Sequence, residues 1–352
     1  MNKPAFFNNL TRTSFIFLLI GGILTFSSCK RAEEIFDELL DQDDDHVQEM
    51  NDVRVFASTN TGGNFTIFDV SDLHDIEQTV ASTGSMDADG IFYSADQDIV
   101  YQLSRTDNMV YGYTDIMDLM KKENVYPAFG STSDFTNGRE IHVEGNTLVV
   151  ADDVADMNQI LVYKIFQNDL RLDKVYRVHI DLWGIKLVDG TLFAVEDGTN
   201  NLAVYYDFGS KPDSENLAAD VKVSIEGLVR THGIEYDGKN DIMILSDIAD
   251  ATVDNDGGFH VIENFSTKLE EAGDGGMIMM DDQIRVAGDK TFLGNPIDIT
   301  FSVAEKKVYV AERANGGGRL LVFDYPTMNG NYKPVANVNY EGASAVYLDE
   351  EK

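Results

Sequence analysis

The sequence predicts an all-β fold made of six similar sheets of four strands each, and three observations lead to that prediction. A short strand pattern recurs along the chain at intervals of 50, 44, 49, 65 and 46 residues. Residues that favour tight turns separate the strands within each copy. The sixth copy is divided between the two ends of the chain, which indicates that the ends share one sheet.

The first strand of each copy has apolar residues at alternate positions, as a strand with two different faces requires. Glycine opens three of the copies, which we attribute to crowding where the first strands converge near an axis. The six first strands begin at Gly90, Glu140, Gly184, Gly233, Asp298 and Ser344.

A turn and a second apolar strand follow five of the first strands. The turns contain Asp, Asn and Gly, which tolerate a positive φ or hydrogen-bond locally. The second strands are predicted at 100–103, 148–151, 192–195, 242–245 and 308–311. Third strands that end in aromatic or large aliphatic residues follow, and weaker fourth strands come after them.

The sixth copy supplies only a first strand, at 344–348, and its other strands are found at 53–57 and 65–68. Four-stranded units with a period of 40–50 residues are typical of a β-propeller. Joining the two ends in one sheet avoids two exposed edges. We therefore predict a six-bladed β-propeller of four-stranded blades over residues 52–352, closed by strand exchange between the N- and C-terminal segments.

Two segments lengthen the repeat. Residues 115–124 show helical periodicity and predict a short helix beside their blade. Residues 265–280 are rich in glycine and acidic residues and predict an irregular, mobile excursion.

This blade pattern resembles the TolB-like six-bladed propellers, a group that includes NHL-repeat proteins and gluconolactonase-like hydrolases. The resemblance covers about residues 52–350 and lies in the blade architecture, not in a site motif. It implies the fold, and it offers two classes of function, a binding module or a hydrolase.

The charge of the chain limits its partners. Its 352 residues include 27 Lys and Arg against 61 Asp and Glu, a net charge of −34. Such a charge keeps a protein soluble and repels nucleic acid, so no nucleic-acid partner is expected. The single cysteine excludes an intramolecular disulfide, so the fold must be stabilised by packing. We expect a monomer.

Residues 1–28 predict a signal peptide. A basic segment precedes an apolar run over 14–26, which is shorter than the roughly 20 residues that span a bilayer. Two serines then precede Cys29, the only cysteine. This arrangement resembles a bacterial lipoprotein signal, which implies that Cys29 carries lipid, including palmitate. The alternative is a signal peptide cleaved elsewhere, which would leave a free thiol.

Residues 29–51 are highly charged and lack a strand pattern, so they predict a lipidated acidic tether. Lys30 follows the cysteine where inner-membrane lipoproteins carry a retention aspartate, and the acidic residues beyond it resemble the surface-export signal of Bacteroidota lipoproteins. The resemblance implies a protein anchored to the bacterial outer membrane through Cys29, either periplasmic or surface-exposed.

Polar residues recur where the second strands end and where the first strands begin. In a propeller these two positions lie at the same end of the central channel, so we expect the side chains to converge on one mouth. The first column after the second strands holds Ser58, Ser104, Asp152, Glu196, Ser246 and Glu312. The second column holds Thr59, Arg105, Asp153, Asp197, Asp247 and Arg313. The residues before the first strands are Asp89, Arg139, Trp183, His232, Ile297 and Ala343.

From these positions we predict an acidic, partly aromatic binding site for a cation, a sugar or another small polar ligand. Trp183 offers a stacking face, and His232 is the best-placed titratable group. The alternative is that the charges pair with one another across the blades. The predicted ligand-binding residues are Asp89, Arg139, Asp152, Trp183, Glu196, His232, Asp247, Glu312 and Arg313.

The resemblance to gluconolactonase-like enzymes implies a divalent metal held in the channel by oxygen ligands. The carboxylates available for it are Asp152, Glu196, Asp247 and Glu312, and oxygen ligands suit Ca²⁺ or Mg²⁺. The columns lack the pair of asparagines that those enzymes use, which weighs against catalysis.

The preferred hypothesis is a non-catalytic, outer-membrane-anchored lipoprotein. Its propeller would bind a small polar ligand, or a protein or carbohydrate partner, at the channel mouth. The alternative is a lactonase or esterase in the same channel that depends on a divalent metal.

Overall fold

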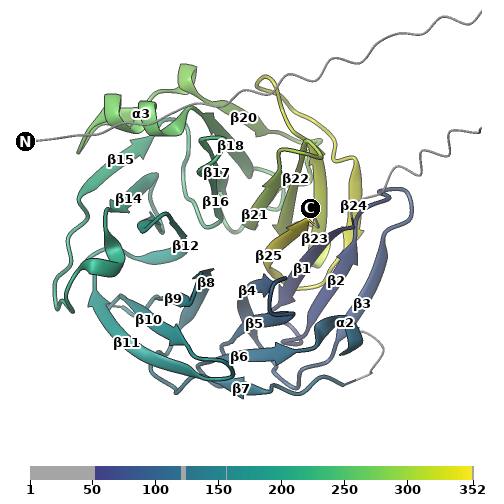
Figure 1. The fold of residues 1–352 in the computed structure, drawn as a ribbon. Helices are drawn as coiled ribbons and strands as arrows, with labels where there is room; N and C mark the ends of the chain where they lie inside the picture. The colour runs from purple at the N-terminus through teal and green to yellow at the C-terminus, as the bar shows by residue number, and fades with distance from the viewer. Residues whose placement is uncertain (1–51, 120–123, 156, 351–352) are drawn as a thin grey trace, which may run out of the picture. The chain divides into compact units, whose positions relative to one another are not determined.

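The computed structural model describes residues 52–119, 124–155 and 157–350. In this part of the chain, six antiparallel sheets stand side by side around a central axis (Figure 1). Each sheet contributes one inner strand to the axis and three further strands that follow outward, and one sheet has a short fifth strand at its outer edge. The predicted all-β, six-bladed architecture is confirmed.

We number the blades in the order of their inner strands along the chain. Blade 1 comprises β4 (Ala88–Ser94), β5 (Ile99–Ser104), β6 (Met109–Thr114) and β7 (Phe129–Gly130). Blade 2 comprises β8 (Gly138–Glu144), β9 (Thr147–Asp152), β10 (Gln159–Ile165) and β11 (Leu170–Arg177). Blade 3 comprises β12 (Leu182–Val188), β13 (Thr191–Glu196), β14 (Asn201–Tyr205) and β15 (Val221–Ile225).

The remaining blades have the same order from the axis outward. Blade 4 comprises β16 (Ile234–Asp237), β17 (Ile242–Asp247), β18 (Gly258–Glu263) and β20 (Ile284–Ala287). Blade 5 comprises β21 (Pro296–Ser302), β22 (Lys307–Glu312), β23 (Arg319–Asp324) and β24 (Ala336–Asn339). Blade 6 comprises β25 (Ala343–Glu350), β1 (Val53–Thr59), β2 (Phe65–Asp69) and β3 (Glu77–Ala81).

Blade 6 is built from both ends of the described chain. Its inner strand β25 pairs antiparallel with β1, so that Val55 lies opposite Leu348 and Ala57 opposite Val346. Figure 1 shows purple β1 beside yellow β25. The predicted strand exchange is therefore present, and the ring depends on a strand from the C-terminal segment.

Residues that accept a positive φ make the turns between the first and second strands. Asp98 and Asp189 have φ values of 50° and 49°, and Gly190 follows with 75°. Lys306 adopts a φ of 52° at the equivalent turn of blade 5. Asp and Gly favour this region locally, whereas a lysine there is held by the strands on either side.

Two of the glycines that open the inner strands show why crowding selects them. A Cβ on Gly184 would lie 2.1 Å from the carbonyl oxygen of His232, and a Cβ on Gly233 would lie 2.7 Å from Cα of Asp298. Neither glycine has a positive φ, so the constraint is space and not backbone conformation. Neighbouring inner strands therefore approach backbone to backbone near the axis, as the sequence predicted.

Five of the six inner strands are irregular where they begin, and in β25 the pairing with β1 skips Ser344. The register shifts in β4, β8, β12 and β21 span Asp89, Arg139, Trp183 and Ile297 respectively. A bulge redirects a side chain and is common beside functional sites. These bulges place the residues before the predicted first strands out of the regular alternation, at the start of each strand.

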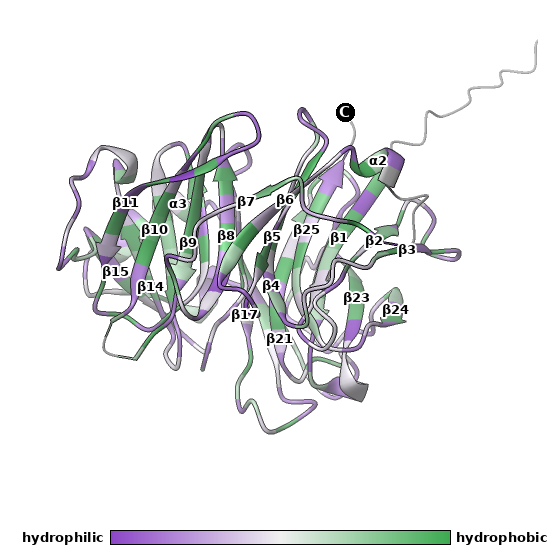
Figure 2. Ribbon diagram, turned by 90° about the horizontal axis from the view of Figure 1, so that it is seen from below, coloured by the Kyte–Doolittle hydropathy of each residue, from purple (hydrophilic) through white to green (hydrophobic). Residues whose placement is uncertain are grey.

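The hydrophobic core lies between neighbouring blades. In one cluster, Val149 and Ile160 of blade 2 pack against Leu192 and Tyr205 of blade 3. Figure 2 shows hydrophobic residues along the strands and hydrophilic residues in the connecting loops. Each fully buried apolar side chain contributes about 1.5–3 kcal/mol, so the packing between blades stabilises a ring that has no disulfide.

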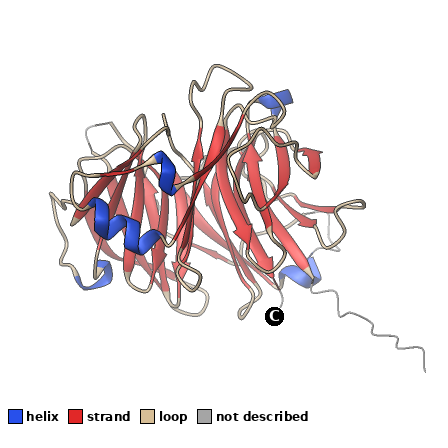
Figure 3. Cartoon of the chain, turned by 90° about the horizontal axis from the view of Figure 1, so that it is seen from above, coloured by secondary structure: helices blue, strands red, loops and turns tan. Residues whose placement is uncertain are grey.

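The two insertions differ in how well they were predicted. The helix α2 (Ile116–Leu119) lies within the predicted segment 115–124. The segment after β18 is ordered where an irregular excursion was expected, because Phe265 and Leu269 are buried on one side of α3 (Phe265–Ala272). The chain then adds β19 (Met277–Ile278) in parallel to the edge of blade 3. Figure 3 shows the helices outside the sheets.

The predicted signal peptide, Cys29 and the tether lie outside the described residues. Within the described ranges, no helix is both long and apolar enough to cross a membrane.

Candidate ligand site at the channel mouth

We define the channel mouth as the end of the propeller at which the six inner strands begin. In every blade, a residue following the second strand donates its backbone N–H to a carbonyl just before the inner strand. The six bonds are Arg105 to Asp87, Asp153 to Asn137, Asp197 to Asp181, Ile248 to Arg230, Arg313 to Asn295 and Asn60 to Gly342, with N···O distances of 2.7–3.1 Å. Both sets of loops therefore meet at one end of each blade.

Three carboxylates of the predicted site anchor these loops. Asp152 accepts hydrogen bonds from the backbone N–H groups of Thr136 and Asn137. In the same way, Asp247 accepts from Val229 and Arg230, and Glu312 accepts from Gly294, Asn295, Ala314 and Asn315. All three side chains are fully buried. Glu312 is bonded by backbone N–H groups, whereas Oδ2 of Asp152 also accepts from Gln159 Nε2 and Oδ2 of Asp247 from Arg285, so all three carboxylates are occupied by the protein itself.

The same bonds change the alignment of two blades. Asp247 accepts the same kind of loop hydrogen bond as Asp152 and Glu312, so Asp247 belongs to the first column and Ile248 to the second. In blade 6, Asn60 and not Thr59 occupies the second-column position. The sequence alignment was wrong by one residue in both blades, because it counted from apolar residues and not from the loop hydrogen bonds.

The four carboxylates proposed as metal ligands do not come together. Glu196 accepts from Asn201 Nδ2 at 2.8 Å and pairs with Lys222 at 3.1 Å, on the outer side of its own blade. The other three hold loops in three separate blades. Across the described residues, no group of three or more His, Cys, Asp or Glu side chains is arranged to hold a metal ion.

Trp183 lies at the centre of a stack. The His232 ring is parallel to it, with ring centroids 3.4 Å apart and planes inclined by 4°. The guanidinium carbon of Arg139 lies 4.0 Å from the ring centroid. Because Arg139 and His232 come from the blades on either side of Trp183, they cover opposite faces of the indole. A ligand therefore cannot stack on Trp183 as the sequence suggested without displacing one of them.

Two aspartates hold the ends of this stack. Asp153 pairs with Arg139 at 2.9 Å. Asp197 accepts from Arg230 through both oxygens and lies 2.9 Å from His232 Nε2. Burial raises the pKa of Asp197, but the bonds from His232 and Arg230 outweigh it and the net shift is downward. An ionised Asp197 only accepts, so Nε2 of His232 carries the proton and Nδ1 has the free lone pair.

His232 is neutral at physiological pH. Burial lowers its pKa to about 4, although Asp197 opposes the shift. Its Nδ1 and the Oγ1 of neighbouring Thr231 are both buried with no hydrogen-bond partner among the described residues. Unpartnered buried polar atoms are rare and often mark functional positions.

Asp89 occupies the equivalent position in blade 1, and its side chain is 3% exposed. Burial raises the pKa of Asp89 to about 7, while the charges of Arg105, Arg139 and Arg313 oppose the shift. Of the predicted site residues, Arg139 and Arg313 therefore influence the charge of Asp89.

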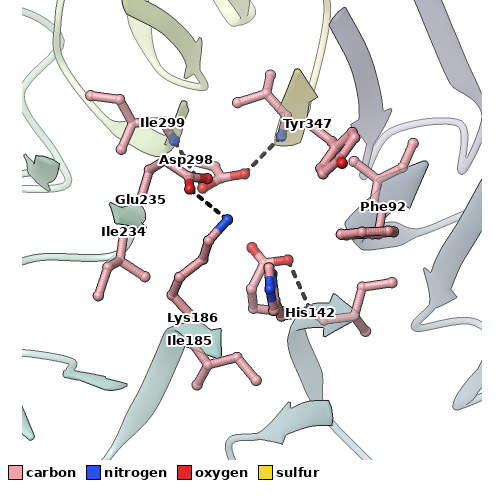
Figure 4. A pocket seen from close by; sticks show the side chains of 13 residues that line it. Phe92, His142, Ile185, Lys186, Ile234, Glu235, Asp298, Ile299 and Tyr347 are labelled. Atoms are coloured by element: carbon pink, nitrogen blue, oxygen red, sulfur yellow. Dashed lines mark hydrogen bonds and ion pairs between the residues drawn. The ribbon is translucent and has the colours of Figure 1, made fainter. Parts of the chain in front are cut away.

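A small cavity lies farther along the axis, lined by all six inner strands (Figure 4). Its volume of about 20 Å³ is enough for a water molecule. Lys186 extends into it and pairs with Glu235 at 2.5 Å, near the carboxyl group of Asp298. Glu140 also lines the cavity, and its carboxyl group interacts by charge with Lys186 and Asp298. Burial raises the pKa of Asp298 to about 8 and that of Glu140 well above its usual range.

This cluster was not predicted from the sequence. The signal was present, because Glu140, His142, Lys186, Glu235 and Asp298 are polar residues inside otherwise apolar inner strands. These positions face the axis, where the six strands bring them within reach of one another.

Comparisons with known proteins identify the fold and not an activity. No family model matches the sequence, and no curated protein is significantly similar to it. The solved structure of a candidate 6-phosphogluconolactonase from Bacteroides fragilis is similar with a TM-score of 0.58 and 10% identity, over 87% of this chain and 100% of the other.

Two further solved structures are similar at the same level. A chain of the nidogen/laminin complex has a TM-score of 0.56 and 12% identity, over 84% of this chain and 98% of the other. A protein of unknown function from Desulfotomaculum acetoxidans has a TM-score of 0.51 and 12% identity, over 81% and 79% of the two chains. At these identities the likeness concerns the fold alone, and with the sheet topology it shows that this chain is a six-bladed β-propeller with four-stranded blades.

Proposed function

We propose that the protein is a lipid-anchored binding module of the bacterial outer membrane, whose propeller binds a small polar ligand or a partner at its channel mouth. The observation that supports this is the set of buried polar atoms at the mouth that have no hydrogen-bond partner among the described residues. They belong to Asp87, Arg105, Thr231, His232 and Asn295, which flank the inner strands of three blades. Leaving such atoms unsatisfied costs about 1–3 kcal/mol each, and a bound ligand would remove that cost.

The only tryptophan provides a direct test, because Trp183 lies at the mouth. A ligand that contacts Arg139 or His232 will alter their stacking on the indole and so change its fluorescence. We expect a saturable change with at least one member of a set of neutral sugars, hydroxy acids, amines and short peptides. The proposal fails if none of these changes the emission or the melting temperature.

The anchor is tested separately with Cys29→Ala in the full-length precursor. Lipidation of the thiol would hold the protein in the membrane, so we expect the variant to move from the outer-membrane fraction to the soluble fraction. Fractionation followed by immunoblotting measures the change. A variant that stays with the outer membrane would show that another feature provides the attachment.

The second candidate is a lactonase, and His232 is the observation that favours it. With Asp197 on Nε2, the free Nδ1 has the geometry of a general base that could take a proton from water attacking a lactone carbonyl. The neighbouring structure described as a candidate 6-phosphogluconolactonase shares this fold. A base with a pKa of about 4 is weak at neutral pH, however, and the described carboxylates form no metal site.

Lactone hydrolysis decides between the two candidates. A catalytic His232 predicts measurable turnover of simple sugar lactones that falls at least about a hundredfold in His232→Gln, the loss typical of a missing general base. We expect no turnover in either protein. Hydrolysis that depends on His232 would make the lactonase the correct function.

A further inference from the structure

A pocket larger than the axial cavity lies at the end of the propeller opposite the channel mouth, between blades 3 and 4. Its volume is about 240 Å³, somewhat below the roughly 300–1,000 Å³ of pockets for drug-sized ligands. Its walls come from β13 and the turn before it, the residue that follows β14, β16 and the turn after it, and α3. We call it the turn pocket. Its volume suits a small molecule.

Aromatic rings form much of the turn pocket. Phe193 and Phe265 are buried, and their ring centroids lie 5.0 and 5.4 Å from that of Tyr236. Tyr236 of blade 4 is half-buried, and Tyr206 of blade 3 is 43% exposed. The face of an aromatic ring carries a partial negative charge, which attracts a cation. Tyr206 and Tyr236 are therefore the rings that a ligand can reach.

Hydrogen bonds hold the Tyr236 ring in place. Its hydroxyl donates to Oδ1 of Asp241 at 2.9 Å. The same carboxylate accepts from the backbone N–H of Ser266 in α3 at 2.9 Å and from its hydroxyl at 2.7 Å. These bonds join blade 4 to α3 on one side of the pocket. A ring that is already fixed loses little conformational freedom when a ligand binds.

Asp189 supplies a negative charge beside these rings, and of the described residues that line the turn pocket it alone is charged. Its side chain is exposed, and within the described ranges its carboxylate accepts no hydrogen bond and pairs with no cation. A Cβ on Gly238 would lie 3.8 Å from Oδ2 of Asp189 and 3.6 Å from Cε1 of Tyr236. One small cation can therefore contact both the carboxylate and the aromatic ring.

Another pocket, at the same end of blade 5, lacks this available charge. Its volume is about 260 Å³, and it is also lined by two tyrosines, Tyr325 and Tyr332. Its carboxylate, on Asp324, pairs with Lys307 at 3.1 Å, and Lys333 lies in its wall. An aromatic surface and an unpaired carboxylate thus occur together in the turn pocket and not in the pocket of blade 5.

We propose that the turn pocket binds a small alkylammonium compound, with its charge beside Asp189 and its alkyl groups against Tyr206 and Tyr236. The proposal does not rest on the function proposed for the channel mouth. A neutral apolar ligand would cover the carboxylate without compensating its lost hydration. Ca²⁺ and Mg²⁺ are poorly matched, because they take several oxygen ligands and this pocket offers one carboxylate. The net charge of −34 also favours a cation.

An NMR titration of the intact protein that observes the methyl signal of choline tests the proposal. The comparison compound is 3,3-dimethyl-1-butanol, in which carbon replaces the nitrogen, so that the shape is kept and the charge is lost. We expect choline to bind with a dissociation constant in the millimolar range. The alcohol should bind at least about tenfold more weakly, the effect of losing 1.4 kcal/mol. Potassium chloride at equal ionic strength should not displace choline.

Two substitutions probe the pocket itself. Asp189→Asn removes the charge and keeps a residue that tolerates the φ of 49° at this turn, so binding of choline should weaken at least about tenfold, again 1.4 kcal/mol. Gly238→Ala adds a methyl group between Asp189 and Tyr236 and should also weaken binding. Asp207→Asn is the matched control. Asp207 is an exposed aspartate of the same blade with a φ of 47°, it does not line the pocket, and its loss should change nothing.

The melting temperature of each variant shows whether it folds like the parent. The inference is overturned if choline gives no saturable signal up to about 10 mM, ten times a millimolar dissociation constant. It is also overturned if Asp189→Asn or Gly238→Ala binds choline like the parent, or if Asp207→Asn loses as much affinity as Asp189→Asn.

Two further results would assign the turn pocket to another ligand. Equal affinity for the neutral alcohol would make it an apolar pocket. Tighter binding of the peptide Gly-Lys-Gly than of choline would assign it to a lysine side chain of a protein partner. None of these outcomes decides the function proposed for the channel mouth, because Trp183 fluorescence reports on the opposite end of the propeller.

Discussion

Truncation of the chain before Ala343 will abolish the cooperative thermal unfolding of the propeller. The deletion removes β25, which is the inner strand of blade 6 and pairs with β1 from Val53 to Thr59. Ala343, Ala345 and Val346 are buried in the native ring, and their loss exposes the inner edge of β1. An open ring leaves unpaired strand edges next to uncovered core, so we expect loss of the near-UV circular dichroism signal and aggregation on heating.

A truncation after Glu350 is the matched control, because it leaves β25 intact, and it should melt like the full chain. Adding a synthetic peptide of residues 343–352 to the shorter truncation should restore part of the near-UV signal by refilling the same edge. If the truncation before Ala343 still melts cooperatively within about 5 °C of the parent, roughly the shift that 2 kcal/mol produces in a chain of this size, the strand exchange is not what holds the ring together.

The repeat in the sequence was sufficient to predict this dependence. The signals are local: turn residues such as Asp189 and Gly190, and the alternation of apolar residues within each strand. They recur in each copy of the repeat because every blade has the same geometry. The glycines at 184 and 233 carried further information, since the lack of a side chain at the start of an inner strand indicates close backbone contact with the neighbouring blade.

The roles of the mouth residues could not be predicted in the same way. Asp152 and Asp153 are adjacent carboxylates, yet Asp152 holds a loop through backbone N–H groups and Asp153 faces Arg139. Which neighbour turns inward depends on a bulge in β8 and on the path of the preceding loop. Both are tertiary features without a sequence pattern.

The aromatic site illustrates a second limit. Trp183 was expected to offer a free stacking face, because the sequence shows the residue but not what covers it. Arg139 and His232, from the two adjacent blades, cover both faces of the indole. They approach Trp183 because the blades are arranged in a ring, and no single blade would bring them together. The same closure lets the charge of Arg313 act on the pKa of Asp89, although the two residues are more than 200 positions apart in the sequence.

The second large effect concerns the acidic residues around the axial cavity, where Glu140→Gln should stabilise the protein at alkaline pH. The pKa of Glu140 is raised by burial first and by the neighbouring Asp298 next. A raised pKa in the folded state means that folding takes up protons between the unfolded pKa and the folded pKa, so stability falls as the pH rises through that window. For Asp298 the window extends from about 4 to about 8. We therefore expect the parent protein to lose stability between pH 4 and pH 8, by this mechanism.

Glutamine at 140 keeps the oxygen that accepts from the backbone N–H of Ile141, and it carries no charge that repels Asp298. Its melting temperature at about pH 8 should exceed that of the parent by at least about 2 °C, the shift that 1 kcal/mol produces in a large domain, and the difference should vanish near pH 4. Glu235→Gln is the matched control from the same cavity. It removes the partner that lies 2.5 Å from Lys186 and leaves a partly buried ammonium unpaired, so it should destabilise the protein at both pH values. If the melting temperatures of Glu140→Gln and the parent depend on pH in the same way, repulsion between Glu140 and Asp298 does not destabilise the folded protein. A higher melting temperature for Glu140→Gln together with a lower one for Glu235→Gln would attribute the destabilisation to the acidic pair and not to Lys186.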